Sequence, residues 1–236
     1  MNIFYASPSD VHQDVIELRG QEAIHASKAL RYSRGDNITV VDGQGGWYEG
    51  EVHTILSESV RIAISSHTAR PEPQSAPVLG IGIIKKQDRL EFAVEKAVEL
   101  GVKGVQFFRG EHSVKQNVRL DRLQSVVVSA MKQSLRAWKP ELRVFKNLEA
   151  MADYYGEKRK IIASHQTAER SFDGLELTDQ EAPVVLLTGP EGGFSNREQA
   201  FLKDRQTTFV RLNARRLRTE TAGITMLAQY HFCLTT

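Results

Sequence analysis

The stretch that decides the fold reads Leu187-Thr188-Gly189-Pro190-Glu191-Gly192-Gly193-Phe194, and it follows an apolar run that begins at Val184. Glycine costs backbone entropy in a regular element and proline removes a hydrogen-bond donor, so we expect a strand to end here in a shaped loop. The spacing fits neither the dinucleotide-binding fingerprint nor the P-loop. The carboxylate of Glu191 disfavours a phosphate ligand, which indicates a neutral or cationic ligand such as a sulfonium compound.

A second motif lies further along the chain and reads Arg215-Arg216-Leu217-Arg218-Thr219-Glu220-Thr221-Ala222. Between the two motifs, Ser195 and Glu198 have the spacing of a capping box. This spacing predicts a helix that begins directly after the glycine-rich loop, residues 188–194, with its first N–H groups turned toward that loop. Apolar residues continue after the second motif and predict a largely buried final helix over Thr219–Leu234.

Strand-like and helix-like segments alternate between residue 78 and the final helix, which predicts a mostly parallel α/β sheet. The helix expected from Asp88 carries apolar residues at helical spacing and reaches Gly101, a suitable residue to follow its last turn. The expected strands are Val78–Ile84, Val105–Phe108, Lys160–Ser164, Val184–Leu187 and Phe209–Leu212, and the expected helices are Asp88–Leu100 and Leu120–Leu135.

The first part of the chain has a different pattern. Short apolar runs alternate with turn signals between Ile38 and Ser65, which predicts a small β-barrel or meander, and a helix-like segment over Glu22–Leu30 precedes it. Three of the seven prolines then fall within Ala69–Pro77, which favours an extended connection. We therefore predict two domains, residues 1–70 and residues 78–236, joined by a linker over residues 71–77.

Composition sets the class of protein. The chain has 236 residues, of which 41% are hydrophobic and 25% charged, as in an ordinary globular protein. It shows neither a long apolar run nor a basic and apolar start, so we expect a cytoplasmic protein without a membrane span. Cys233 is the single cysteine, and the histidines lack metal-ligand spacing, so no metal site is expected. The net charge of +2 is too small to identify a nucleic-acid partner, although the basic residues cluster.

The paired motifs resemble those of the bacterial 16S rRNA (uracil-N3) methyltransferases, a family of the SPOUT superfamily. Lys96–Val102 and Gln133-Ser134-x-Arg136 add weaker matches. Asn213 departs from the family, which usually has glycine there, and His112 stands where the family usually has arginine. The resemblance implies an α/β domain with a deep trefoil knot, a small N-terminal PUA-like β-barrel, S-adenosylmethionine as cofactor and a homodimer. It also implies 16S rRNA, within the assembled small ribosomal subunit, as the partner.

Residue roles follow from the resemblance and from the chemistry of the acceptor. Uracil N3 carries a proton, so a base or a cation that stabilises the imide anion must assist methyl transfer. Arg218 and Arg136 are the electrostatic candidates, and Glu220 is the candidate base. Cofactor binding is expected from Leu187, Thr188, Gly189, Pro190, Glu191, Gly192, Gly193, Phe194, Leu212, Asn213, Leu217, Thr219, Thr221 and Ala222, and RNA binding from Arg31, Arg34, Lys132, Arg215 and Arg216.

Other interpretations stay open from the sequence. Related knotted proteins more commonly methylate the ribose 2′-hydroxyl, and the basic clusters would also suit an RNA-binding protein without catalysis. Arg218 could form a structural ion pair with Glu220 or Glu191. Thr219 and Thr221 could serve only as helix caps.

Overall fold

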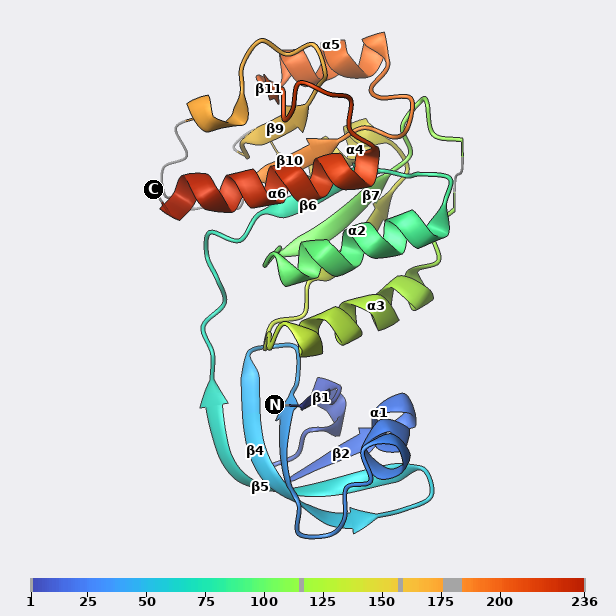
Figure 1. The fold of residues 1–236 in the computed structure, drawn as a ribbon, viewed down its shortest axis with the longest axis vertical. Coiled ribbons are helices and arrows are strands. Elements are labelled where there is room, and N and C mark those ends of the chain that lie inside the picture. Colours follow the sequence, from blue (N-terminus) through green and yellow to red (C-terminus); the bar gives the residue numbers. More distant parts are fainter. Residues whose placement is uncertain (1, 115–116, 157–158, 176–183, 236) are drawn as a thin grey trace. The chain divides into compact units, whose positions relative to one another are not determined.

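The computed structural model describes residues 2–114, 117–156, 159–175 and 184–235. The chain forms two compact units, one of which comprises Met1–Glu72 and Val128–Lys139 and the other Pro73–Val127 and Pro140–Thr236 (Figure 1). The chain therefore enters the first unit twice, and helix α3 (Leu120–Gln133) contributes residues to both units.

A curled five-stranded sheet forms most of the first unit. Its order is β1-β3-β4-β5-β2, with β1 parallel to β3 and the other pairs antiparallel. The long strands β4 and β5 shift register between Glu49 and Gly50 and between Val52 and Thr54, which bends the sheet over a core that includes Phe4, Leu18 and Ile62. The strands are β1 (Ile3–Tyr5), β2 (Val15–Arg19), β3 (Asn37–Val41), β4 (Gly46–Ile55) and β5 (Ser59–Ala69).

The helical segment of this unit begins two residues earlier than predicted and is less regular. It begins at Gly20 as α1 (Gly20–Ile24) and continues as one π-helical turn, η2 (His25–Ala29). A 3-10 turn, η1 (Pro8–Asp10), precedes β2. Arg31 has a φ of 56°, so the chain leaves the helix there through a left-handed residue.

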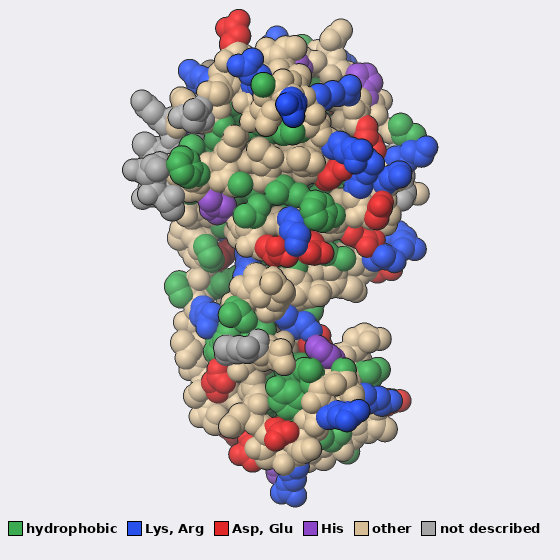
Figure 2. Space-filling view, viewed as in Figure 1, with side chains coloured by type: hydrophobic (Ala, Val, Ile, Leu, Met, Phe, Trp, Pro, Cys, Tyr) green, Lys and Arg blue, Asp and Glu red, His purple; other side chains and the backbone are tan. Residues whose placement is uncertain are grey.

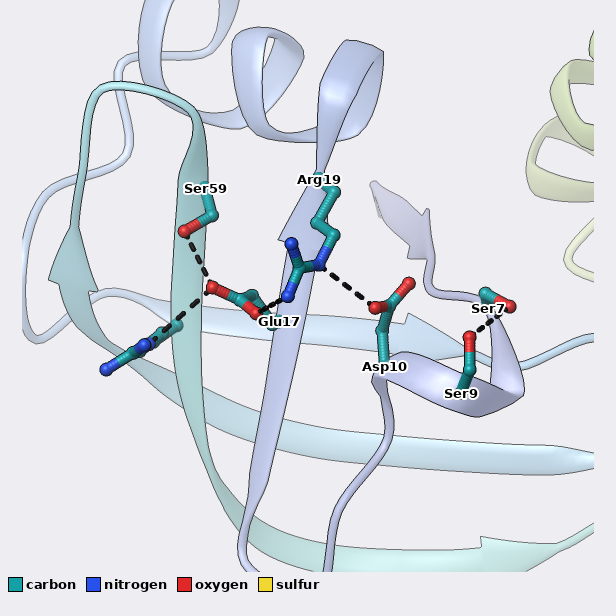
Figure 3. Close-up of polar contacts among 7 residues, drawn as sticks. Ser7, Ser9, Asp10, Glu17, Arg19 and Ser59 are labelled. Carbon is teal, nitrogen blue, oxygen red and sulfur yellow. Dashed lines mark hydrogen bonds and ion pairs between the residues drawn. The ribbon is translucent and has the colours of Figure 1, made fainter.

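Glu17 organises a polar cluster on the first unit (Figure 3). Its carboxylate accepts a hydrogen bond from Ser59 Oγ (2.8 Å) and pairs with Arg19 and Arg61, while Arg19 Nε also donates to Asp10 Oδ1 (3.0 Å). The Ser59 hydrogen bond and, to a lesser extent, the two arginines lower the pKa of Glu17. Two basic side chains of this unit are thus engaged by carboxylates.

A six-stranded parallel sheet forms the centre of the second unit, in the order β11-β9-β10-β6-β7-β8. Every residue of β6, β7 and β10 is buried, as expected where helices cover both faces of a parallel sheet. The strands are β6 (Val78–Gly82), β7 (Gly104–Phe108), β8 (Glu141–Phe145), β9 (Ile161–Ser164), β10 (Val185–Thr188) and β11 (Thr208–Val210).

Alternate strand residues contact different helical layers. Val78 belongs to a cluster that includes Met151 of α4 and Leu202 of α5, whereas Leu79 faces Gly223 of α6 on the other side. Helix α2 packs beside α6, as Figure 1 shows. The helices are α2 (Gln87–Glu99), α4 (Leu148–Tyr155), α5 (Asn196–Asp204) and α6 (Thr219–Thr235), and a 3-10 turn, η3 (Phe172–Gly174), lies between β9 and β10.

The prediction of a mostly parallel α/β fold is confirmed, and the expected strands are present with shifts at their ends. The apolar stripe of α2 is buried as predicted, and Gly101 follows the helix with a φ of 81°. Strand β8 and helix α4 are not among the elements expected from the sequence. Phe232 of the final helix is 67% exposed, because the buried residues Met226, Leu227 and Tyr230 form a stripe on the opposite side at 3.6 residues per turn.

Among the described residues, no helix combines the length and the apolar character that crossing a membrane requires.

Candidate functional site

A cavity of about 580 Å³ lies in the second unit, where the neighbouring parallel strands β9 and β10 end. Ligand sites of open α/β sheets are found at such carboxyl ends, because the loops that follow the strands meet there. Both motifs identified in the sequence line it. The lining residues are Arg89, Ser164, His165, Gln166, Thr188, Gly189, Pro190, Glu191, Gly192, Gly193, Phe194, Leu212, Asn213, Arg215, Arg216, Leu217, Arg218, Thr219, Glu220 and Ala222.

The glycine-rich loop forms the first wall. Gly193 N–H donates to the Pro190 carbonyl (2.8 Å) to close a turn, and Gly193 has a φ of 72°, a conformation that favours glycine. A Cβ on Gly189 would lie 3.0 Å from backbone atoms of Gly193 and Phe194. The Glu191 carboxylate accepts a hydrogen bond from Lys85 N–H (2.7 Å), so this side chain shapes the loop.

Leu212–Thr219 form the second wall. Asn213 Oδ1 accepts a hydrogen bond from Arg215 N–H (2.9 Å), and Gln229 Nε2 donates to the Leu212 carbonyl (3.3 Å). Asn213 is not among the described residues with positive φ. Asparagine therefore stabilises this turn through its side-chain hydrogen bond, rather than by adopting the left-handed conformation available to glycine.

The two walls are joined directly, and the first is anchored by a helix. Arg216 Nη2 donates to the Glu191 carbonyl across the cavity (3.2 Å). The predicted capping box at the start of α5 is confirmed, since Ser195 Oγ accepts from Glu198 N–H (3.1 Å) and Glu198 Oε2 accepts from Ser195 N–H (2.8 Å). The loop thus runs between a buried strand and a capped helix.

Charged groups of both signs face the cavity. Glu220, in the first turn of α6, is 6% exposed and pairs with Arg89 of α2 (Nε to Oε1, 3.6 Å). Arg218 is exposed, and within the described part of the chain its guanidinium makes neither an ion pair nor a hydrogen bond. The structural pairing of Arg218 with Glu220 or Glu191 that the sequence allowed is therefore not formed, because Arg89 takes the position beside Glu220.

Most residues predicted for the cofactor line this cavity, and two do not. Leu187 is fully buried within β10, and Thr221 is exposed on α6. Four lining residues were not predicted from the sequence: Arg89, Ser164, His165 and Gln166. Ser164 is the last residue of a predicted strand, and His165 and Gln166 follow it. The pairing of β9 with β10 brings these residues to the cavity, but the sequence does not specify strand order.

The remaining predicted residues belong to the first unit. Burial lowers the pKa of Arg136 to about 10, so its guanidinium keeps its charge at neutral pH. Lys132 Nζ pairs with Glu22 Oε1 (2.6 Å), and both side chains are largely buried. Arg31 and Arg34 are exposed. Among the residues that the structure describes, there is no group of three or more potential metal ligands.

Comparisons with known proteins agree with this architecture. The chain is 26% identical over 233 residues to the ribosomal RNA small subunit methyltransferase E of Rickettsia conorii, covering 97% of this chain and 94% of that one. A probable rRNA-methyltransferase of Porphyromonas gingivalis is similar in structure, with a TM-score of 0.89, 29% identity and coverage of 100% of this chain and 99% of that one.

A ribosomal RNA small subunit methyltransferase E from Neisseria gonorrhoeae, solved bound to S-adenosyl methionine, has a TM-score of 0.83 and 26% identity, covering 98% of this chain and 97% of that one. The sequence profile of the RNA methyltransferase domain matches residues 71–231, well over half of the chain. The chain therefore belongs to the RNA methyltransferase domain family.

Proposed function

We propose that this protein transfers a methyl group from S-adenosylmethionine to N3 of a uridine in small-subunit ribosomal RNA. The observation that carries the proposal is that both the glycine-rich loop and Leu212–Ala222, the two motifs on which the resemblance rests, line one cavity. The names of the relatives and the cofactor in the Neisseria gonorrhoeae structure support it.

The cavity residues fit S-adenosylmethionine. A volume of about 580 Å³ is within the usual range of small-molecule sites. Thr188 is 1% exposed, and its Oγ1 has no hydrogen-bond partner among the described residues although the residue lines the cavity, as expected for a group that bonds a ligand. Gly189 and Gly192 present backbone rather than side chain to the cavity that they line. When bound, S-adenosylmethionine supplies an electrophilic methyl group.

The residues of the chain have two tasks in this reaction. The walls must hold donor and acceptor in line, because alignment accounts for much of the rate in a displacement. The N3 proton must also leave. We assign to Arg218 the stabilisation of the negative charge that develops on the uracil imide; its position in the cavity lining and the absence of a carboxylate partner among the described residues support this role. Glu220 is the candidate proton acceptor, and Arg89 holds its carboxylate at the cavity wall.

Nucleoside analysis tests the proposal. Small ribosomal subunits from a strain that lacks the gene are incubated with the protein and methyl-labelled donor, and the rRNA is digested to nucleosides. We expect the label in 3-methyluridine. Label on a ribose 2′-hydroxyl would instead identify a 2′-O-methyltransferase, and unlabelled RNA that still binds the protein would identify a non-catalytic binding protein.

We also infer a deep trefoil knot in residues 78–236, a PUA-like RNA-binding fold for residues 1–70 and a linker over residues 71–77. The resemblance supports all three inferences. The curled sheet of the first unit is compatible with a PUA-like fold. Mechanical unfolding tests the knot. Pulling from both ends should leave the extended chain shorter than its full contour length, whereas extension to the full length would contradict a knot.

We further propose a homodimer that acts in the cytoplasm on the assembled small subunit. Phe92 of α2 and Phe232 of α6 are 48% and 67% exposed on helices that pack side by side, which supports a surface covered by a second copy. Sedimentation should give twice the mass of one chain. A monomer at all concentrations would contradict the dimer.

A further inference from the structure

The loop that follows β7, residues 109–114, contacts the glycine-rich loop at several points. A Cβ on Gly110 would lie 3.0 Å from the ring of Pro190, so the two loops pack closely. Glu111 N–H donates to Glu198 Oε1 (3.0 Å), the same carboxylate that closes the capping box of α5. Glu198 is 2% exposed, so the acceptor of this partly buried hydrogen bond is shielded from water.

His112 contacts two consecutive residues of the glycine-rich loop. Its Nδ1 lies 3.2 Å from the carbonyl oxygens of both Gly192 and Gly193. Carbonyl oxygens only accept hydrogen bonds, so Nδ1 must carry the proton, either in one neutral tautomer or in the imidazolium. The side chain also packs against the loop, because a Cβ on Gly192 would lie 2.7 Å from His112 Cβ.

His112 does not itself line the cavity, whereas Gly192 and Gly193 do. One donor shared by two successive carbonyl groups fixes the orientation of both peptide planes. The opposite edge of the same loop then faces the ligand in one conformation rather than in several. Any effect of His112 on the ligand must therefore be transmitted through the loop.

We propose that His112 is a positioning residue that holds the glycine-rich loop in its donor-binding conformation through the Nδ1 hydrogen bond. This inference rests on the proposed assignment of the cavity to S-adenosylmethionine. It predicts that the loop depends on a hydrogen-bond donor at the Nδ1 position and not on the imidazole ring as such.

Three substitutions of His112 separate the effect of the hydrogen-bond donor from the effect of the imidazole ring. Asparagine places an N–H₂ group near the position of Nδ1, alanine removes the donor, and aspartate presents acceptors to two carbonyl groups. For S-adenosylmethionine binding measured by calorimetry, we expect His112→Ala to weaken the affinity about three- to tenfold, the usual value of one hydrogen bond. His112→Asn should restore most of the affinity, and His112→Asp should bind more weakly than His112→Ala.

Val114→Ala is the matched control, since Val114 belongs to the same loop and is 70% exposed. Its affinity should equal that of the unaltered protein. Methylation assays should show a raised KM for the donor in His112→Ala with kcat at saturating donor unchanged. Thermal unfolding without ligand confirms that each variant is folded.

The outcomes distinguish this inference from the proposed function. If the unaltered protein fails to bind S-adenosylmethionine, the cavity assignment is wrong. If the unaltered protein binds and the alanine, asparagine and aspartate variants bind equally well, or follow ring size rather than donor capacity, only the role of His112 is overturned.

Discussion

Arg218 stands at the cavity wall without a carboxylate partner in the described structure, whereas Glu220, two residues on, is held by Arg89. The sequence placed Arg218 and Glu220 together but gave no indication of Arg89, which comes from a distant helix. The sequence also does not specify which backbone conformation Asn213 adopts in its turn. The Arg89 contact depends on the packing of α2 against α6, which has no local pattern in the sequence. The Asn213 turn is a local interaction, but asparagine can form a turn either by this hydrogen bond or by a left-handed conformation.

Replacing Arg218 should impair the chemical step more than donor binding. We expect Arg218→Ala to lower kcat by roughly a hundredfold, the size of effect seen when a group that stabilises developing charge is removed. The affinity for S-adenosylmethionine should change far less. Arg211→Ala is the control, because Arg211 is an exposed arginine in the same segment and does not line the cavity. Equal turnover in the two variants would remove Arg218 from the mechanism.

At the level of elements, the strands and helices nearest the two motifs could be predicted best. Strand β10 and helix α5 are marked by local signals, an apolar run that ends at glycines and a capping box. Strand β8 and helix α4 were missed, since every β8 residue is only partly buried or exposed and the strand lacks a continuous apolar run. Glu198 performs more than its predicted role, because it also binds Glu111 N–H.

Removing Glu198 should therefore cost more than removing an ordinary helix cap. Glu198→Ala leaves the buried Ser195 N–H and the partly buried Glu111 N–H without their partner, and we expect a loss of about 1–3 kcal/mol in the free energy of unfolding. Urea denaturation measures this change. Lys203→Ala, an exposed change in the same helix, should be nearly neutral. Equal stability of the two variants would contradict the stabilising role of the two Glu198 hydrogen bonds.

At the scale of the whole molecule, a parallel sheet could be predicted from the alternation of elements, but its strand order could not. Strand β10 lies between β6 and β9, and residues 128–139 belong to the first unit. The strand order and this assignment depend on contacts between residues far apart in the sequence. The distribution of charge also emerges only in three dimensions. Figure 2 shows lysine and arginine side chains interspersed with aspartate and glutamate on the visible face.

This charge distribution makes individual arginines testable as RNA contacts. Arg31 and Arg34 are exposed, whereas Arg19 is engaged by Glu17 and Asp10. For binding to small-subunit rRNA, we expect Arg31→Ala or Arg34→Ala to reduce the slope of log affinity against log salt by about one, the effect of losing one phosphate contact. Arg19→Ala should leave the slope nearly unchanged. A similar slope for all three variants would contradict a specific role for Arg31 and Arg34.

The central claim is that the cavity between the glycine-rich loop and Leu212–Thr219 binds S-adenosylmethionine. Calorimetric titration of the unaltered chain, Gly189→Ala and Gly174→Ala with this compound tests it most directly. A Cβ on Gly189 would press on the backbone of Gly193 and Phe194, whereas one on Gly174 would meet no atom within 4 Å. We expect saturable binding by the unaltered chain and by Gly174→Ala, and strongly weakened binding by Gly189→Ala. Absence of binding by the unaltered chain, or equal affinity in all three proteins, would contradict it.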